Sequence, residues 1–140
     1  MNITKKLVAL STTLATVLGL TFNAFAAAPA ETLPSGVKIV HTVDGTGAQP
    51  KASDSVKVHY RGTLADGTEF DSSIKRGTPA TFPLNRVVPC WTEGMQKIKV
   101  GGKATLTCPP ATAYGSRGAG AAVPPNATLT FEVELLAIEK

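Results

Sequence analysis

The sequence predicts a single α+β domain in which a twisted, mostly antiparallel β-sheet of five or six strands wraps around one short α-helix. Apolar and polar residues alternate along residues 55–64 and 127–138, the period of two expected of half-buried strands. Asp66-Gly67 separates two extended segments, and glycine readily takes the positive φ of a tight hairpin turn. Several strands with one helix and no alternating βαβ pattern indicate an α+β domain.

Residues 1–26 have the features of a signal peptide. Lys5 and Lys6 precede an apolar run over residues 7–22, and Ala-Phe-Ala at residues 24–26 provides the small residues of a cleavage site. A membrane anchor is the alternative, but a spanning helix needs about 20 mostly apolar residues, and this run contains serine and threonine. We therefore expect a chain secreted across the inner membrane, into the periplasm, with no membrane attachment after cleavage.

The 114 residues that remain after cleavage are enough for one domain with one core. Residues 27–36 are rich in Ala and Pro without periodicity, which predicts a flexible N-terminal arm, and we expect the domain over residues 37–140. Trp91, Met95 and Ile98 are spaced by four and three residues, which predicts a helix over residues 92–100. Alternation and turn residues predict strands over residues 37–43, 55–64, 68–71, 104–108 and 127–138.

Charge and cysteine content limit the partners. Loss of Lys5 and Lys6 lowers the net charge of +4 to +2, and no basic run remains, so we expect no nucleic-acid binding. Cys90 and Cys108 lie in the exported part, where they either form a disulfide or stay as two buried thiols. Without a C-x-x-C motif or closely spaced histidines, no metal site and no cofactor are predicted.

Several enzyme classes are excluded by missing motifs. The chain has no G-x-S-x-G, no H-E-x-x-H and no cysteine paired with an evident His and Asn, the patterns of common hydrolases. The glycines at residues 115–120 (GSRGAG) stand in the wrong order for a dinucleotide loop and lack a βαβ unit. Nucleophilic and nucleotide-dependent chemistry are therefore not indicated.

Five sequence blocks together resemble the FKBP family of peptidyl-prolyl cis-trans isomerases. They occur in the family's order and extend over nearly all of residues 37–140: VHYRG at 58–62, GTEFDSS at 67–73, VVPCWTEG at 87–94, AYG at 113–115 and VPPNATLTFEVELL at 123–136. The resemblance implies an FKBP-like fold and a rotamase that acts without a covalent intermediate. It implies proline-containing polypeptide segments as substrates.

The resemblance also implies a site. Trp91 would form the floor of a pocket for the prolyl ring. Asp71 would face the substrate carbonyl and bind the Tyr60 hydroxyl, with Arg76 as an ionic partner. Tyr114 and the Val88 backbone N–H would each donate a hydrogen bond to a carbonyl. The other implied wall and rim residues are Phe70, Phe82, Val87, Ala113, Ala122, Val123 and Phe131.

The chain departs from the better-known eukaryotic members at the rim of this pocket. Ala80 stands where an aromatic residue is common, Ala119 where a histidine is common, and Ala122-Val123 is smaller than the usual branched pair. Each lost apolar contact of side-chain size removes roughly 1–2 kcal/mol of burial. We therefore expect FKBP-type macrolide ligands to bind with reduced affinity.

A second interpretation is a binding module, in which the same groove holds unfolded or proline-containing segments and turnover is incidental. Residues 115–123, between Tyr114 and Pro124, contain no large insertion, and no helical dimerisation arm precedes Val37. The isomerase is therefore the favoured interpretation, and we expect a monomer. A disulfide between Cys90 and Cys108 would brace the pocket floor.

Overall fold

The computed structural model describes residues 30–139, so the predicted signal peptide lies outside the described residues. Seven strands form one sheet in the order β1-β2-β6-β7-β3-β4, with β5 also paired to β3, and every pairing is antiparallel. The strands are β1 (Ala30–Thr32), β2 (Lys38–Val43), β3 (Ser55–Leu64), β4 (Glu69–Ser72), β5 (Ala80–Pro83), β6 (Lys103–Cys108) and β7 (Leu129–Glu139).

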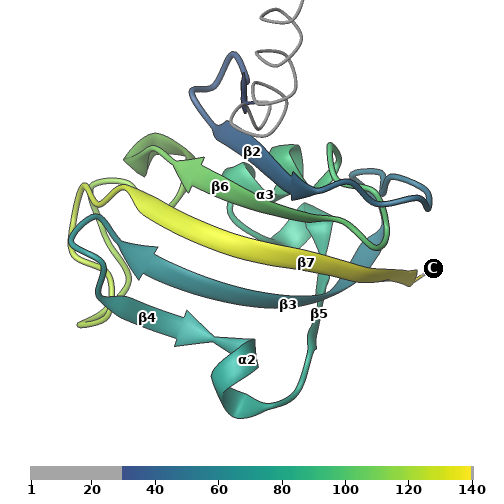
Figure 1. Cartoon of the computed structure of the whole chain (residues 1–140). Coiled ribbons are helices and arrows are strands. Elements are labelled where there is room, and N and C mark those ends of the chain that lie inside the picture. Colours follow the sequence, from purple (N-terminus) through teal and green to yellow (C-terminus); the bar gives the residue numbers. More distant parts are fainter. Residues whose placement is uncertain (1–29, 140) are drawn as a thin grey trace, which may run out of the picture.

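The main helix, α3 (Pro89–Met95), lies across one face of this sheet, behind β6 and β7 in Figure 1. Two 3₁₀ turns, Leu84–Arg86 and Pro110–Thr112, and the short helix α2 (Ser73–Arg76) complete the elements. This arrangement confirms the predicted α+β architecture, with seven strands instead of the five or six expected.

The core lies between the sheet and α3. Alternation along β3 and β7 sends every second side chain to this side, as the sequence pattern predicts. The largest side chains that are almost completely buried are Ile39, Leu84, Met95, Ile98, Leu106, Leu129 and Leu135.

Strand β3 pairs with three other strands, β4, β5 and β7. It pairs with β7 along its whole length, while its other edge is shared by two short strands. The N-terminal half of β3 pairs with β5, and Arg61–Thr63 pairs with β4. Between these two partners the chain leaves the sheet through α2, as Figure 1 shows. The connection between β4 and β5 therefore contains the helical turn α2.

Helix α3 begins and ends earlier than the predicted residues 92–100. Pro89 occupies its first turn, where the missing N–H is not needed. The helix does not continue to residue 100, because the Ile98 amide donates only three residues back, to Met95, and the Val100 amide donates to the Ala48 carbonyl at 3.0 Å. Ile98 is buried as predicted, but from the turn that follows the helix.

The predicted flexible arm is partly ordered in the structure. Ala30–Thr32 pairs with β2, in the register Ala30↔Val40, and forms the edge of the sheet. All three residues of β1 are exposed, so the pairing rests on backbone hydrogen bonds and leaves no apolar pattern in the sequence.

Candidate active site

A cavity of about 460 Å³ opens between the sheet, α3 and the loop after β6. Its lining combines a large aromatic surface with few charged groups. The lining residues are Tyr60, Phe70, Asp71, Phe82, Arg86, Val87, Val88, Trp91, Tyr114 and Phe131. None of them is a serine, threonine, cysteine, lysine or histidine.

Trp91 lies at the centre of the aromatic surface and is only 4% exposed. The rings of Tyr60, Phe82 and Phe131 stand at 85–86° to the indole, with centroids 5.3–5.4 Å away. Such edge-to-face contacts are favourable for aromatic pairs and hold the rings at fixed angles. Among residues 30–139, the indole Nε1–H has no nitrogen or oxygen acceptor.

Gly62 makes a further aromatic contact possible. It pairs with Asp71 on one side of β3 and with Phe131 on the other. A Cβ at this position would lie 2.6 Å from Phe70 Cζ and 2.9 Å from Phe131 Cε1. The rings of Phe70 and Phe131 therefore contact each other over Gly62, where there is no side chain, with their centroids 5.6 Å apart.

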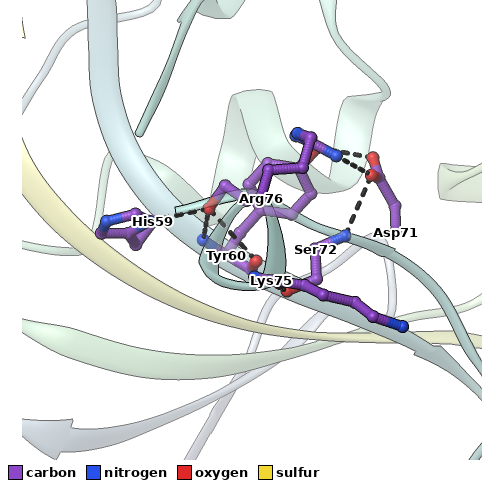
Figure 2. Close-up of polar contacts among 7 residues, drawn as sticks. His59, Tyr60, Asp71, Ser72, Lys75 and Arg76 are labelled. Carbon is purple, nitrogen blue, oxygen red and sulfur yellow. Dashed lines mark hydrogen bonds and ion pairs between the residues drawn. The ribbon is translucent and has the colours of Figure 1, made fainter. Parts of the chain in front are cut away.

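A polar triad closes one side of the cavity (Figure 2). The Tyr60 hydroxyl donates to Asp71 Oδ2 at 2.5 Å, and Arg76 Nη1 donates to Asp71 Oδ1 at 2.7 Å. Arg76 Nη2 also donates to the Tyr60 oxygen at 3.2 Å. The Asp71–Tyr60 and Asp71–Arg76 contacts confirm the pairs that the resemblance implied.

The pKa values in the triad follow from these contacts. Partial burial alone would raise the pKa of Asp71, but hydrogen bonds from Tyr60 and Arg76 and the nearby positive charge outweigh it, so the pKa is lowered. Burial, followed by the hydrogen bond to Asp71, raises the pKa of Tyr60. Asp71 is thus an anion and Tyr60 a neutral phenol at neutral pH.

Two serines of the GTEFDSS block hold the triad in place, a role that the sequence analysis missed. The Ser72 hydroxyl accepts from Lys75 N at 3.0 Å and caps α2, which carries Arg76. The buried Ser73 hydroxyl accepts from Tyr60 N at 2.7 Å, and it lies 3.0 Å from His59 Nδ1. The sequence does contain a signal for the Ser72 cap, because serine is a preferred helix N-cap residue.

Helix α3 and β6 are joined beneath the cavity by a disulfide between Cys90 and Cys108. Their Cα atoms are 5.6 Å apart, and both side chains are fully buried. Of the two alternatives left open by the sequence, the disulfide is thus the one found. Because Cys90 precedes Trp91, the bond fixes the segment that carries the cavity floor.

Not every predicted site residue lines the cavity. Arg76 contacts it only through Asp71 and Tyr60, and Ala113 is half-buried and packs against the core. Ala122 is exposed, whereas Val123 is 3% exposed, packs in the core and forms a bridge with Ala119.

Arg86 lines the cavity and was not predicted. It ends the 3₁₀ turn that leads into Val87 and Val88, and its side chain is exposed. Only its position directly before the VVPCWTEG block could have indicated this, because a 3₁₀ turn has no apolar periodicity. The Val88 amide has no acceptor among the described residues and remains able to donate to a ligand.

Within residues 30–139, no group of three or more His, Cys, Asp or Glu residues is arranged to hold a metal ion. No helix in the same part of the chain is long and apolar enough to cross a membrane.

A mostly aromatic cavity bordered by one ionised carboxylate is typical of a domain that binds an apolar ligand. Residues 46–136 match the sequence model of the FKBP-type peptidyl-prolyl cis-trans isomerases. The chain therefore belongs to this family.

Individual relatives agree with this assignment. The chain is 65% identical over 96 residues to the FKBP-type peptidyl-prolyl cis-trans isomerase FkpA of Aeromonas hydrophila, covering 69% of this chain and 35% of that protein. It is 50% identical over 103 residues to FK506-binding protein 1 of Dictyostelium discoideum, covering 72% of this chain and 96% of that one.

Among solved structures, the crystal structure of FkpA from Escherichia coli superposes with a TM-score of 0.77 at 47% identity. The match covers 84% of this chain and 55% of that chain. The first curated bacterial relatives are considerably longer, and the matched region spans only 35–50% of their length.

Proposed function

We propose that the protein catalyses the cis-trans isomerisation of X-Pro bonds in exported polypeptides. The observation that carries the proposal is the cavity itself, in which six aromatic residues line a space bordered by Asp71. Isomerisation fits such a site because it needs neither a covalent intermediate nor proton transfer.

The physical problem is amide resonance. Rotation about the C–N bond faces a barrier of about 18–20 kcal/mol because the partial double bond must be broken. The twisted amide has less charge separation than the planar one, so a dry aromatic cavity favours it relative to the planar form. Catalysis then arises from interactions that are stronger in the transition state than in the ground state.

The residues take separate roles in this proposal. Trp91 supports the prolyl ring, and Tyr60, Phe82 and Phe131 form the walls that exclude water. Asp71 faces the carbonyl of the rotating bond, held in place by Tyr60 and Arg76. Two donors, the Tyr114 hydroxyl and the Val88 amide, bind carbonyls on either side and fix the chain while the bond turns.

We place this activity in the periplasm. The signal-like residues 1–26 and the Cys90–Cys108 disulfide both support an exported protein, since disulfides persist in oxidising compartments. Secreted chains that contain proline are then the substrates. The domain needs no partner chain to complete its cavity, which supports a monomer as the active form.

The test compares isomerisation of a short X-Pro peptide, by exchange NMR, in the mature protein and in Asp71→Leu and Phe131→Ala variants. We expect a clear loss of exchange enhancement in both. Lys57→Gln, on the opposite face of β3, is the matched control and should retain full activity. Equal rates in wild type and both site variants, with folding intact by circular dichroism, would overturn the assigned site.

A further inference from the structure

The cavity has an uncompensated positive charge. Two of its lining residues are charged, Asp71 and Arg86. The negative charge of Asp71 is matched by Arg76, with a 2.7 Å contact between Nη1 and Oδ1. Arg86 has no ion pair or hydrogen bond to any residue that the structure describes. A ligand in the cavity therefore meets one unmatched cation.

The backbone beneath Arg86 is fixed. Leu84, at the start of the same 3₁₀ turn, is fully buried, and its amide donates to the Asp54 carbonyl at 2.9 Å. The Leu84 carbonyl accepts from the Thr92 hydroxyl of α3 at 2.6 Å. The turn is thus anchored to both the loop before β3 and the main helix. Arg86, the last residue of this anchored turn, lines the cavity.

The cavity is large enough for more than the proline. Its volume of about 460 Å³ falls in the range of about 300–1,000 Å³ found for small-molecule sites. The residues that flank the proline can therefore lie against the wall where Arg86, Val87 and Val88 follow one another. Apolar walls of low dielectric focus the field of a charge into a cleft, so a flanking side chain senses this cation, and the exposure of Arg86 keeps the effect small.

We propose that Arg86 is a specificity determinant that selects proline segments with an acidic side chain next to the proline. The inference rests on the proposed function, because it assumes that a proline segment is the ligand. The Asp71–Arg76 pair on the other wall is neutral as a unit and does not cancel the preference. A basic flanking residue would be disfavoured by the same field.

The test uses two sets of short peptides with a single proline, one with Glu, Gln or Lys directly before it and one with these residues directly after it. Dissociation constants come from chemical-shift titration, and isomerisation rates from exchange NMR on the same samples. The wild type should bind the Glu peptide of at least one set about two- to fivefold more tightly than the Gln peptide, with Lys weakest. The ratio should shrink in high salt.

Three variants isolate the guanidinium charge. In Arg86→Gln the Glu-to-Lys ratio should fall to about one, and in Arg86→Lys the order should be retained. Lys57→Gln removes an exposed cation from the opposite face of β3 and should keep the wild-type ratio. Each ratio is formed within one variant, so a general change in affinity does not affect it.

The inference is overturned if neither peptide set shows the charge order in the wild type, or if Arg86→Gln keeps it. Failure of the proposed function has a different signature. In that case no peptide would exchange faster with the protein present, while the dissociation constants would still report whether Arg86 selects acidic segments.

Discussion

The Tyr60 hydroxyl lies 2.5 Å from Asp71 Oδ2, which joins the middle of β3 to the end of β4 at the border of the cavity. Arg76 of α2 contacts both groups and completes a closed triangle of hydrogen bonds. The carboxylate is therefore held by two donors, and it cannot rotate away from the cavity without breaking charge-assisted bonds. This geometry fixes the orientation of the Asp71 carboxylate at the border of the cavity.

Replacement of Asp71 should reduce isomerisation more than loss of its phenol partner. We expect Asp71→Leu to lower kcat/KM by about tenfold or more, because a hydrogen bond or contact to a charged group contributes roughly 1.5–3 kcal/mol. Tyr60→Phe keeps the ring against Trp91 and should cost less. Exchange NMR on one peptide measures both. A larger loss in Tyr60→Phe than in Asp71→Leu would show that the phenol, and not the carboxylate, is the important group.

Because its pKa is lowered in the folded protein, Asp71 should stabilise the fold at neutral pH and lose this contribution in acid. A carboxyl group whose pKa is lower in the folded state stabilises the fold above its unfolded value of about 3.9, and this contribution disappears as the pH falls through the folded value. The free energy of unfolding of wild type minus Asp71→Asn should thus be constant from pH 5 to 8 and decline below pH 4. Urea titrations across this range measure it, and a difference that grew on acidification would contradict the assignment.

The strands that carry the site could be predicted because each has one buried face. Tyr60 and Phe131 alternate with polar neighbours on β3 and β7, and this alternation survives in the structure. Trp91 was predicted from helical spacing with Met95, and both are buried from α3. Burial of one face thus produces a periodic pattern of apolar residues, which can be recognised in a single sequence.

Features that depend on backbone pairing or on irregular turns produce no such periodic pattern, so the sequence did not predict them. The exposed strand β1 pairs through its backbone, and Arg86 reaches the cavity from a 3₁₀ turn of three residues. The end of α3 was misplaced because Ile98 fits helical spacing, although residues 100–102 are hydrogen-bonded to other segments. Such long-range contacts are not encoded in local periodicity.

The disulfide should stabilise the fold and hold the segment of α3 that carries Trp91 against β6. It closes a loop across 18 positions of sequence, for which the chain-entropy model gives about 3 kcal/mol. Cys90→Ala with Cys108→Ala should lower the free energy of unfolding by this order, as measured by urea denaturation. Intact mass after alkylation without reduction should show no label, and two labels only after reduction in denaturant. Two labels without reduction would disprove the bond.

Small rim residues should weaken macrolide binding. Ala80 and Ala122 do not line the cavity, as expected if the rim is trimmed at these positions. We expect FKBP-type macrolides to bind more weakly than they bind a member with an aromatic rim, and Ala122→Ile to recover part of the affinity by restoring roughly 1–2 kcal/mol of apolar burial. Isothermal titration calorimetry of the wild type, Ala122→Ile and an aromatic-rimmed member measures the macrolide affinities. Equal affinity for the wild type and the aromatic-rimmed member would refute the prediction.

Gly62 should be the most sensitive backbone position of the site. A methyl group there would lie 2.6 Å from Phe70 Cζ and 2.9 Å from Phe131 Cε1, so Gly62→Ala must displace both rings. Overpacking of this kind costs about 1–3 kcal/mol, and the displaced rings border the prolyl site, so kcat/KM should fall together with stability.

Gly67→Ala separates these two effects. Gly67 has a φ of 90° and open space around it, so alanine there should cost about 1–2 kcal/mol of backbone strain without touching an aromatic ring. At temperatures where both variants are fully folded, only Gly62→Ala should have a reduced rate of peptide isomerisation. If the two variants lost activity equally, the contact between Phe70 and Phe131 would have no role in the reaction, and the catalytic surface would have to be confined to the rings around Trp91.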